Sequence, residues 1–298
     1  MLQAVRRLFA QSIDYAGEFP PARLDAAAAI REYEAIGRSH DAWILSRYAC
    51  LARSLPTLAE RLRQEHGLAI VPLTVIGSPG ASGAEWDTAR ESDAGLMNRF
   101  LLDVGDLAAI LGYEVAAPPD RPIDTCLAEL DGFGGIDLFI ELRLDEHLED
   151  AIVALAESEI GSAKARTGGV EPGSVPSAAA LAHFMHQTIS LEVPFKLTAG
   201  LHDPFATKRG RGFVNVFGAA VLALAHELSE RETEQILADG SPTSWSFSEA
   251  GVRWRDISAT LDEIEDGRQM LRSFGSCSIA EPLHGLRETG LLETSTIA

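Results

Sequence analysis

The chain has 298 residues, of which 46% are hydrophobic and 23% charged, a composition typical of a globular protein of one or two domains with a large core. Its formal net charge is −19 at pH 7. Most of such a surface repels a polyanion, so the charge argues against DNA or RNA as a partner.

Neither a membrane nor an oxidising compartment is indicated by the sequence. The longest apolar run, residues 217–225, is far shorter than the roughly 20 residues that span a bilayer. The N-terminal segment lacks the apolar stretch of a signal peptide, and the three cysteines form no Cys-x-x-Cys pair. We therefore expect a cytoplasmic protein without membrane attachment, metal or other cofactor.

Strand-like and helix-like segments alternate along the chain. Stretches rich in β-branched and aliphatic residues predict strands at 12–17, 42–49, 69–77, 109–117, 137–144, 162–168 and 194–200, with a shorter candidate at 273–278. Helical spacing of apolar residues predicts helices at 24–36, 145–160, 177–190 and 213–238. Ser177 is placed as an N-cap. The alternation predicts an α/β fold, a single (β/α)₈ TIM barrel over residues 1–298, with a doubly wound open sheet as the alternative.

One segment departs from this alternation. Residues 244–256 have apolar residues on both sides of a Glu-Ala-Gly turn, which predicts a β-hairpin inserted before the last unit. The alternative makes this segment the eighth strand and leaves 273–278 as a loop.

Charged side chains recur along the predicted strands, which in a barrel of this kind carry the active site at their carboxyl ends. They are Glu114 on the fourth strand, Glu141 on the fifth, Lys164 and Arg166 on the sixth, and Lys196 on the seventh, with Arg47 on the second as a further member. Because side chains alternate along a strand, Lys164 and Arg166 share one face, as do Lys196 and Thr198. A substrate site and a structural layer of salt bridges are the two interpretations, and the first is favoured because barrel interiors are usually apolar.

Two neighbouring lysines have a specific chemical use. A free lysine is protonated at pH 7 and cannot attack a carbonyl. A second cation and removal from water both disfavour the charged form, which would lower the pKa and allow the neutral amine to form a Schiff base.

At these residues the sequence resembles deoxyribose-phosphate aldolase and other class I aldolase barrels. In that family a Schiff-base lysine on strand six is followed four residues later by glycine, as Lys164 is by Gly168, and a second lysine on strand seven precedes a glycine turn, as Lys196 does. Their phosphate turn after strand eight is similar to Gly275, Ser276 and Ser278, and their first strand carries an aspartate, as "SIDYAG" does.

The resemblance implies roles for individual residues. Lys164 would be the nucleophile, Lys196 the neighbour that lowers its pKa, and Glu141 or Glu114 the group that moves protons. Gly275, Ser276 and Ser278 would bind an anion, although a plain strand-to-helix turn with Ser278 as N-cap explains them equally well. Glu114 stands only approximately for the family's fourth-strand aspartate, and the second-lysine turn has Ala199–Gly200 instead of two glycines, so a different substrate is expected.

Further candidate substrate contacts lie in the loops after strands six and seven. Arg166, Thr167, Gly168 and Gly169 form a turn that could hold a carboxylate or phosphate, although Arg166 could instead pair with Glu141. His202 and Asp203 follow strand seven and could serve as an acid/base pair or, with Glu141, as metal ligands. The cationic segment 206–215 could attract an anion or be a solvated loop.

Three functions remain open from the sequence. The first is a class I lyase that forms a Schiff base with a small anionic or phosphorylated carbonyl substrate. The second is an isomerase, epimerase or metal-assisted hydrolase that uses the same charged cavity, and the third is a non-catalytic barrel that binds a small metabolite or a protein. Barrels of this kind often associate through their outer helices, so a homodimer is the expected assembly.

Overall fold

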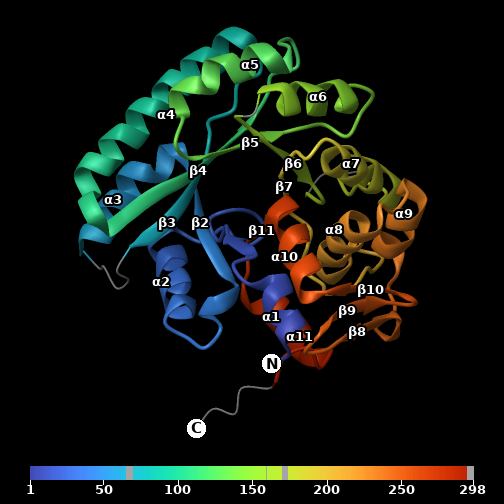
Figure 1. Ribbon diagram of the computed structural model, residues 1–298. Helices are drawn as coiled ribbons and strands as arrows, with labels where there is room; N and C mark the ends of the chain where they lie inside the picture. Colours follow the sequence, from blue (N-terminus) through green and yellow to red (C-terminus); the bar gives the residue numbers. More distant parts are fainter. Residues whose placement is uncertain (65–69, 159, 170–173, 294–298) are drawn as a thin grey trace.

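A computed structural model describes residues 1–64, 70–158, 160–169 and 174–293, and shows a closed barrel of eight parallel strands (Figure 1). Around the barrel the strand order is β1-β11-β7-β6-β5-β4-β3-β2. The strands are β1 (Ile13–Tyr15), β2 (Leu45–Leu51), β3 (Val71–Ile76), β4 (Ala108–Ala116), β5 (Asp137–Glu141), β6 (Ser162–Arg166), β7 (Phe195–Thr198) and β11 (Leu271–Ser276). The predicted TIM barrel is confirmed, and the open sheet is wrong. Residues 69 and 159, at the ends of two predicted elements, lie outside the described residues.

Helices surround the barrel as the alternation predicts (Figure 1). They are α1 (Gln3–Phe9), α2 (Ala26–Gly37), α3 (Leu55–Gln64), α4 (Gly83–Val104), α5 (Ile123–Leu130), α6 (Leu148–Ser158), α7 (Ala178–Ser190), α8 (Phe213–His226), α9 (Glu230–Ala238), α10 (Leu261–Met270) and α11 (Ala280–Glu288). Among the described residues, none of these helices combines the length and the apolar character needed to cross a bilayer.

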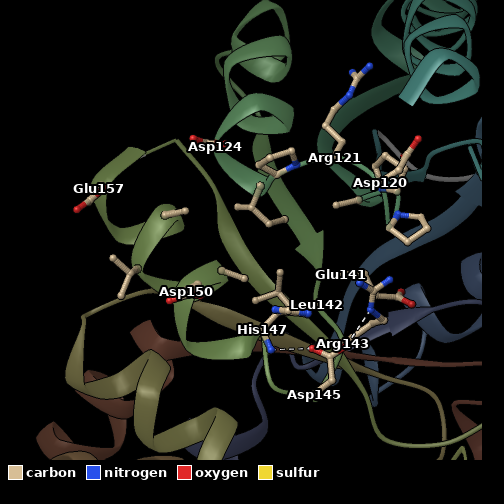
Figure 2. A pocket seen from close by; sticks show the side chains of 18 residues that line it. Asp120, Arg121, Asp124, Glu141, Leu142, Arg143, Asp145, His147, Asp150 and Glu157 are labelled. Carbon is tan, nitrogen blue, oxygen red and sulfur yellow. Dashed lines mark hydrogen bonds and ion pairs between the residues drawn. The ribbon is translucent and has the colours of Figure 1, made fainter. Parts of the chain in front are cut away.

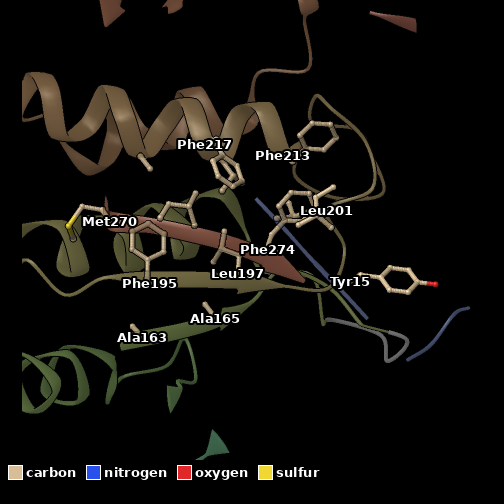
Figure 3. Close-up of a cluster of buried hydrophobic side chains, with 14 of the residues drawn as sticks. Tyr15, Ala163, Ala165, Phe195, Leu197, Leu201, Phe213, Phe217, Met270 and Phe274 are labelled. Atoms are coloured by element: carbon tan, nitrogen blue, oxygen red, sulfur yellow. The ribbon is translucent and has the colours of Figure 1, made fainter. Parts of the chain in front are cut away.

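Alternation along β6 and β7 determines which side chains enter the barrel. Ala163 and Ala165 belong to a buried apolar cluster with Phe195, Leu197 and residues of α8 on the outer side of the sheet (Figure 3). Since neighbouring residues of a strand point to opposite faces, the intervening Lys164 and its register partner Lys196 face the barrel interior.

The helix predicted at 213–238 is two helices. The chain leaves α8 at Glu227, which has a left-handed φ of 51°, and α9 begins after Ser229 in a capping box with Glu232. The predicted cap of α7 is confirmed, because the Ser177 hydroxyl accepts a hydrogen bond of 3.0 Å from the backbone N–H of Ala180.

The insertion is larger than the predicted hairpin. Its strands β8 (Trp245–Phe247) and β9 (Gly251–Trp254) pair antiparallel, and β10 (Ile257–Thr260) adds a third strand to β9. The eighth barrel strand is β11, so the alternative that placed this strand at 244–256 is wrong. The physical reason is pairing: among the described residues the three inserted strands pair only with one another, whereas β11 lies between β1 and β7.

The turns that follow β6 and β7 touch through two glycines. Gly200 has a φ of 79°, and an added Cβ there would lie 2.7 Å from the carbonyl oxygen of Thr167 and 2.9 Å from Gly168 Cα. The close approach and the left-handed backbone both require glycine at this position.

We expect Gly200→Ala to lower the free energy of unfolding by about 2–4 kcal/mol, from left-handed strain and overpacking together. Gly290→Ala is the matched control, since Gly290 has a φ of 72° but no neighbouring atom within 4 Å of an added Cβ. It should cost about 1 kcal/mol. Urea unfolding followed by circular dichroism measures both, and equal losses would contradict the role of the contact.

Candidate active site

Lys164 lies between two carboxylates inside the barrel. Its Nζ is 2.8 Å from Glu114 Oε2, on β4, and 2.9 Å from Glu141 Oε2, at the end of β5. The side chains of Lys164 and Glu114 are 5% and 2% exposed, whereas that of Glu141 is 21% exposed. Glu141 therefore joins a buried ammonium to a partly solvated region.

Lys196 binds the other oxygen of the same glutamate. Its Nζ is 2.6 Å from Glu114 Oε1 and also pairs with Asp14 Oδ2 on β1. The Thr74 hydroxyl donates to Glu114 Oε1 at 3.1 Å, and the Ser273 hydroxyl donates to Asp14 Oδ2 at 2.6 Å. These contacts complete a chain of alternating charges, Glu141–Lys164–Glu114–Lys196–Asp14, that we call the ionic layer.

The ionic layer contains two of the three lysines of the chain and carries three carboxylates. With every group ionised its formal charge is −1, and Arg166 Nη1 stands 3.8 Å from Glu141 Oε1 as a further cation. Removing a charge from water costs several kcal/mol unless a partner and hydrogen bonds replace the solvent. Each lysine neutralises part of the charge of Glu114, and the two lysines therefore share this buried carboxylate.

The pKa of Lys164 moves in the direction opposite to the sequence-based expectation. Burial lowers it, but the attraction of Glu114 and Glu141 and their hydrogen bonds outweigh burial, and the net shift is upward. Burial by itself raises the pKa of Glu114, but the two ammoniums lower it by a larger amount, and the net shift is downward. The expected lowering of the Lys164 pKa is wrong in this charge state because a carboxylate lies between the two lysines.

Arg47 lies at the other end of the barrel from the carboxyl ends of the strands. Its guanidinium pairs with Asp137, the first residue of β5. Gly112, on β4, leaves the space for it, since an added Cβ there would lie 2.5 Å from Arg47 Nη1. Only the backbone N–H of Arg47 reaches the ionic layer, 3.2 Å from Asp14 Oδ1.

The turn after β6 is fixed by contacts with the turn after β7. Thr167 is buried and its hydroxyl donates to the carbonyl oxygens of Thr198, at 3.3 Å, and Ala199. Gly168 packs against Gly200, whereas the side chain of Arg166 is 53% exposed and Gly169 is also exposed. Of the predicted substrate contacts in this turn, Arg166 is the one whose charged end faces solvent, and it pairs with Glu141 at 3.8 Å, the alternative that the sequence also allowed.

The predicted phosphate turn is held by its own hydrogen bonds. The Ser276 hydroxyl donates to the carbonyl oxygen of Ser278 at 2.6 Å, and the Ser278 hydroxyl accepts from the N–H of Glu281 at 3.2 Å. Gly275 packs closely on Thr198, whose Oγ1 would lie 2.8 Å from an added Cβ. These contacts favour the strand-to-helix turn over an anion site.

The other loop residues do not assemble a metal centre. His202 Nδ1 lies 2.8 Å from a carboxylate oxygen of Glu281, and Asp203 pairs with Arg209 at 2.7 Å. Among the described residues no group of three His, Cys, Asp or Glu side chains is arranged to hold a metal ion. The suggested set of His202, Asp203 and Glu141 is thus not brought together.

A groove of about 660 Å³ borders Glu141 between α5 and α6 (Figure 2). Its charged lining is mainly acidic, and the carboxylates are Asp120, Asp124, Glu141, Asp145, Asp150 and Glu157. Its two arginines are already paired, Arg121 with Asp87 and Glu129, and Arg143 with Asp145. The groove is therefore unsuited to an anion.

Sequence reasoning assigned no role to three members of the polar interior. Asp14 was noticed only through the family resemblance, and Thr74 and Ser273 were overlooked. The available signal was a small polar residue at an inward position of a strand, which is weak because hydroxyls are common in sheets. A scan of protein-family models finds no match for this chain, and a search of curated proteins finds no similar sequence. Fold and site together define a TIM barrel with a buried charged interior.

The two opposite pKa shifts predict how stability depends on pH. Glu114 has a folded pKa below its ordinary value of 4.5, so its contribution is present above pH 4.5 and is lost as pH falls through the lower folded value. Lys164 has a raised pKa, so its contribution is present below 10.5 and is lost as pH rises through the higher folded value.

We expect Glu114→Gln to lower the free energy of unfolding at pH 7 by about 3–5 kcal/mol, because two buried ammoniums lose their shared partner. The difference from the unsubstituted protein should shrink as pH falls below 4.5. Glu91→Gln, at an exposed position of α4, is the control and should change stability by less than about 0.5 kcal/mol. Urea unfolding between pH 3 and 8 measures both, and a loss at pH 7 no greater than that of the control would contradict the account.

Proposed function

We propose that the protein is a class I lyase in which Lys164 forms a Schiff base with a small carbonyl substrate. The single observation that carries the proposal is the position of the Lys164 ammonium between Glu114 and Glu141, deep in the barrel, with Lys196 bound to the other oxygen of Glu114. A buried amine flanked by carboxylates has the acid/base groups that iminium formation requires.

The raised pKa of Lys164 requires a route for its proton. In the proposed step the ammonium transfers a proton to the Glu141 carboxylate, and the neutral amine attacks the substrate carbonyl carbon. A proton passes from the attacking nitrogen to the former carbonyl oxygen to give the carbinolamine, and Glu141 then returns its proton to that hydroxyl, which leaves as water. The sum converts a protonated lysine and a carbonyl into a protonated iminium and water, so no net proton is released.

The iminium then accepts the electron pair of the C–C bond that breaks. In a β-hydroxy substrate a base removes the hydroxyl proton, the C–C bond cleaves to give a carbonyl product, and its electron pair forms an enamine on Lys164. Glu141, the partly exposed carboxylate, is the base best placed for this proton. Glu114 and Lys196 lie deeper and hold the nucleophile in position.

The anionic end of the substrate is assigned to the Arg166 side of the mouth. The guanidinium of Arg166 is half exposed and lies 3.8 Å from Glu141 Oε1. A guanidinium can hold a carboxylate or phosphate through two parallel hydrogen bonds. On the other side of Glu141, the groove between α5 and α6 is lined mainly by carboxylates, which would repel the anionic end of a substrate.

Reductive trapping tests the nucleophile directly. We expect borohydride to fix pyruvate, dihydroxyacetone phosphate or acetaldehyde covalently on Lys164, as read by peptide mass spectrometry. Only three lysines are present, and the exposed Lys208 is an internal control for non-specific reaction. Lys164→Arg should abolish the adduct and keep a cation between the two carboxylates. An adduct on Lys196 would reverse the assignment, and equal labelling of Lys208 or none at all would contradict the proposal.

A second variant tests the proton route. We expect Glu141→Gln to slow adduct formation by about 10²–10⁴-fold, since the amide can neither take nor return the proton. Glu146→Gln, at an exposed position in the loop that follows β5, should leave the rate unchanged. Single-turnover trapping at saturating carbonyl compound separates this rate from binding. A rate within threefold of the unsubstituted protein would remove Glu141 from the mechanism.

A non-catalytic barrel is the second candidate, and one observation favours it. Both ammoniums are already paired with carboxylates at hydrogen-bond distance, as in a structural layer of salt bridges. In that case Lys164→Arg should lower the free energy of unfolding, and borohydride should trap no carbonyl compound on the unsubstituted protein.

A further inference from the structure

A second cavity opens at the amino-terminal end of the barrel, opposite the end where the strands finish. Its volume is about 400 Å³, and its walls come from the segment before β1, the starts of β2, β5 and β11, and the last turns of α10. Ser273 and Phe139 line it and also contact the ionic layer, through Asp14 and the Lys196 ammonium respectively. The ionic layer therefore lies between this cavity and the carboxyl-terminal half of the barrel.

Arginine is concentrated in this cavity. In a chain with 25 basic and 44 acidic residues, four lining residues are arginines, and two are carboxylates. The arginines are Arg7, Arg47, Arg268 and Arg272, and the carboxylates are Asp137 and Glu265. The cavity lining thus has a formal charge of +2 (four minus two) in a protein whose net charge is −19.

The excess charge resides on two neighbouring arginines. Arg47 pairs with Asp137, and Arg7 pairs with Glu265 at 2.6 Å. In contrast, Arg268 donates only to backbone carbonyl oxygens, at 2.6 Å for Leu271 and 3.0 Å for Ala10 and Arg272.

Arg272 donates to the side-chain amide of Gln269 at 3.2 Å. Within the described part of the chain, neither Arg268 nor Arg272 has a carboxylate at ion-pair distance. Burial, followed by the like charge of Arg272, lowers the pKa of Arg268 to about 10, so the Arg268 side chain stays charged at pH 7. Two like charges on one wall of a partly enclosed space are most stable when an anion lies between them.

We propose that this amino-terminal cavity binds a compact oxyanion, a phosphoryl group or a small carboxylate, through Arg268 and Arg272. Guanidinium forks match the oxygen spacing of both groups, and Arg272 can present such a fork. Arg268, whose Nη2 already donates to the carbonyls of Ala10 and Arg272, contributes its charge beside it. Backbone carbonyls hold Arg268 in place before binding, so little side-chain entropy is lost when the anion arrives. The site is separate from the proposed lyase site, because it lies on the other side of the ionic layer.

Thermal unfolding with sodium phosphate, compared with sodium chloride at equal ionic strength, tests the proposal. At ten times the dissociation constant we expect phosphate to raise Tm by about 3 °C. Arg272→Gln should raise the dissociation constant for phosphate at least about tenfold in titration calorimetry, because a charge-assisted contact is lost. Arg253→Gln, at an exposed position of β9, is the matched control and should bind as the unsubstituted protein does.

Arg166→Gln distinguishes phosphate binding at one end of the barrel from binding at the other. It changes an exposed arginine of the proposed lyase site, where an anion could also bind, and should leave intact the phosphate site that Arg272→Gln weakens. If Arg166→Gln abolishes binding and Arg272→Gln does not, phosphate binds at the other end and the proposal is wrong. Equal shifts in phosphate and chloride would also overturn it. Arg268→Gln, with its fold checked by circular dichroism, should weaken phosphate binding as Arg272→Gln does.

Discussion

The bridging of two lysine ammoniums by the carboxylate of Glu114 is the interaction on which the rest of the barrel interior depends. Each oxygen of this buried group binds a different lysine, and each lysine binds a second acid. Five ionisable groups on five strands are thereby paired, four of them buried and Glu141 partly solvated, and none of them is isolated. Removal of one member leaves its neighbours as uncompensated buried charges, which is why the layer acts as a unit.

The ionic layer also divides the barrel into two halves with opposite electrostatic character. Toward the carboxyl ends, Glu141 is partly solvated and borders an acidic groove. Toward the amino ends, arginines surround a cavity of positive lining charge. Apolar layers, the usual filling of such barrels, would separate two ends without connecting them. Here Asp14 and Ser273 connect them by hydrogen bonds, so the proposed anion site and the proposed lyase site border the same polar layer.

The charge state of Lys164 determines which chemistry can be proposed. A lysine activated by a like charge would react as a free amine, but the carboxylates around Lys164 raise its pKa and keep it protonated. The proposed mechanism therefore depends on proton transfer within the site, and Glu141 is the partner that reaches solvent. The same contacts would also stabilise a purely structural layer. The catalytic and the structural interpretations differ in whether the Lys164 amine can react with a substrate carbonyl.

Much of this protein follows from the sequence because it depends on local periodicity. The alternation of strand and helix predicts the barrel, and period-2 geometry places Lys164 and Lys196 on its inner face. The Ser177 cap and the eighth strand likewise follow from residues close together in the chain. The break between α8 and α9 and the third inserted strand were missed, because a left-handed residue at Glu227 and the pairing of β10 leave no periodic signal.

What only the tertiary structure decided is which charges meet. The sequence determined the fold class and the inward position of Lys164 and Lys196, since both depend on spacing along a single strand or helix. It could not determine that a carboxylate lies between the lysines, which reverses the expected pKa shift, nor that Arg47 points to the amino-terminal end. Those outcomes depend on strand register and on space left by a residue such as Gly112, and both are set by contacts between segments far apart in the chain.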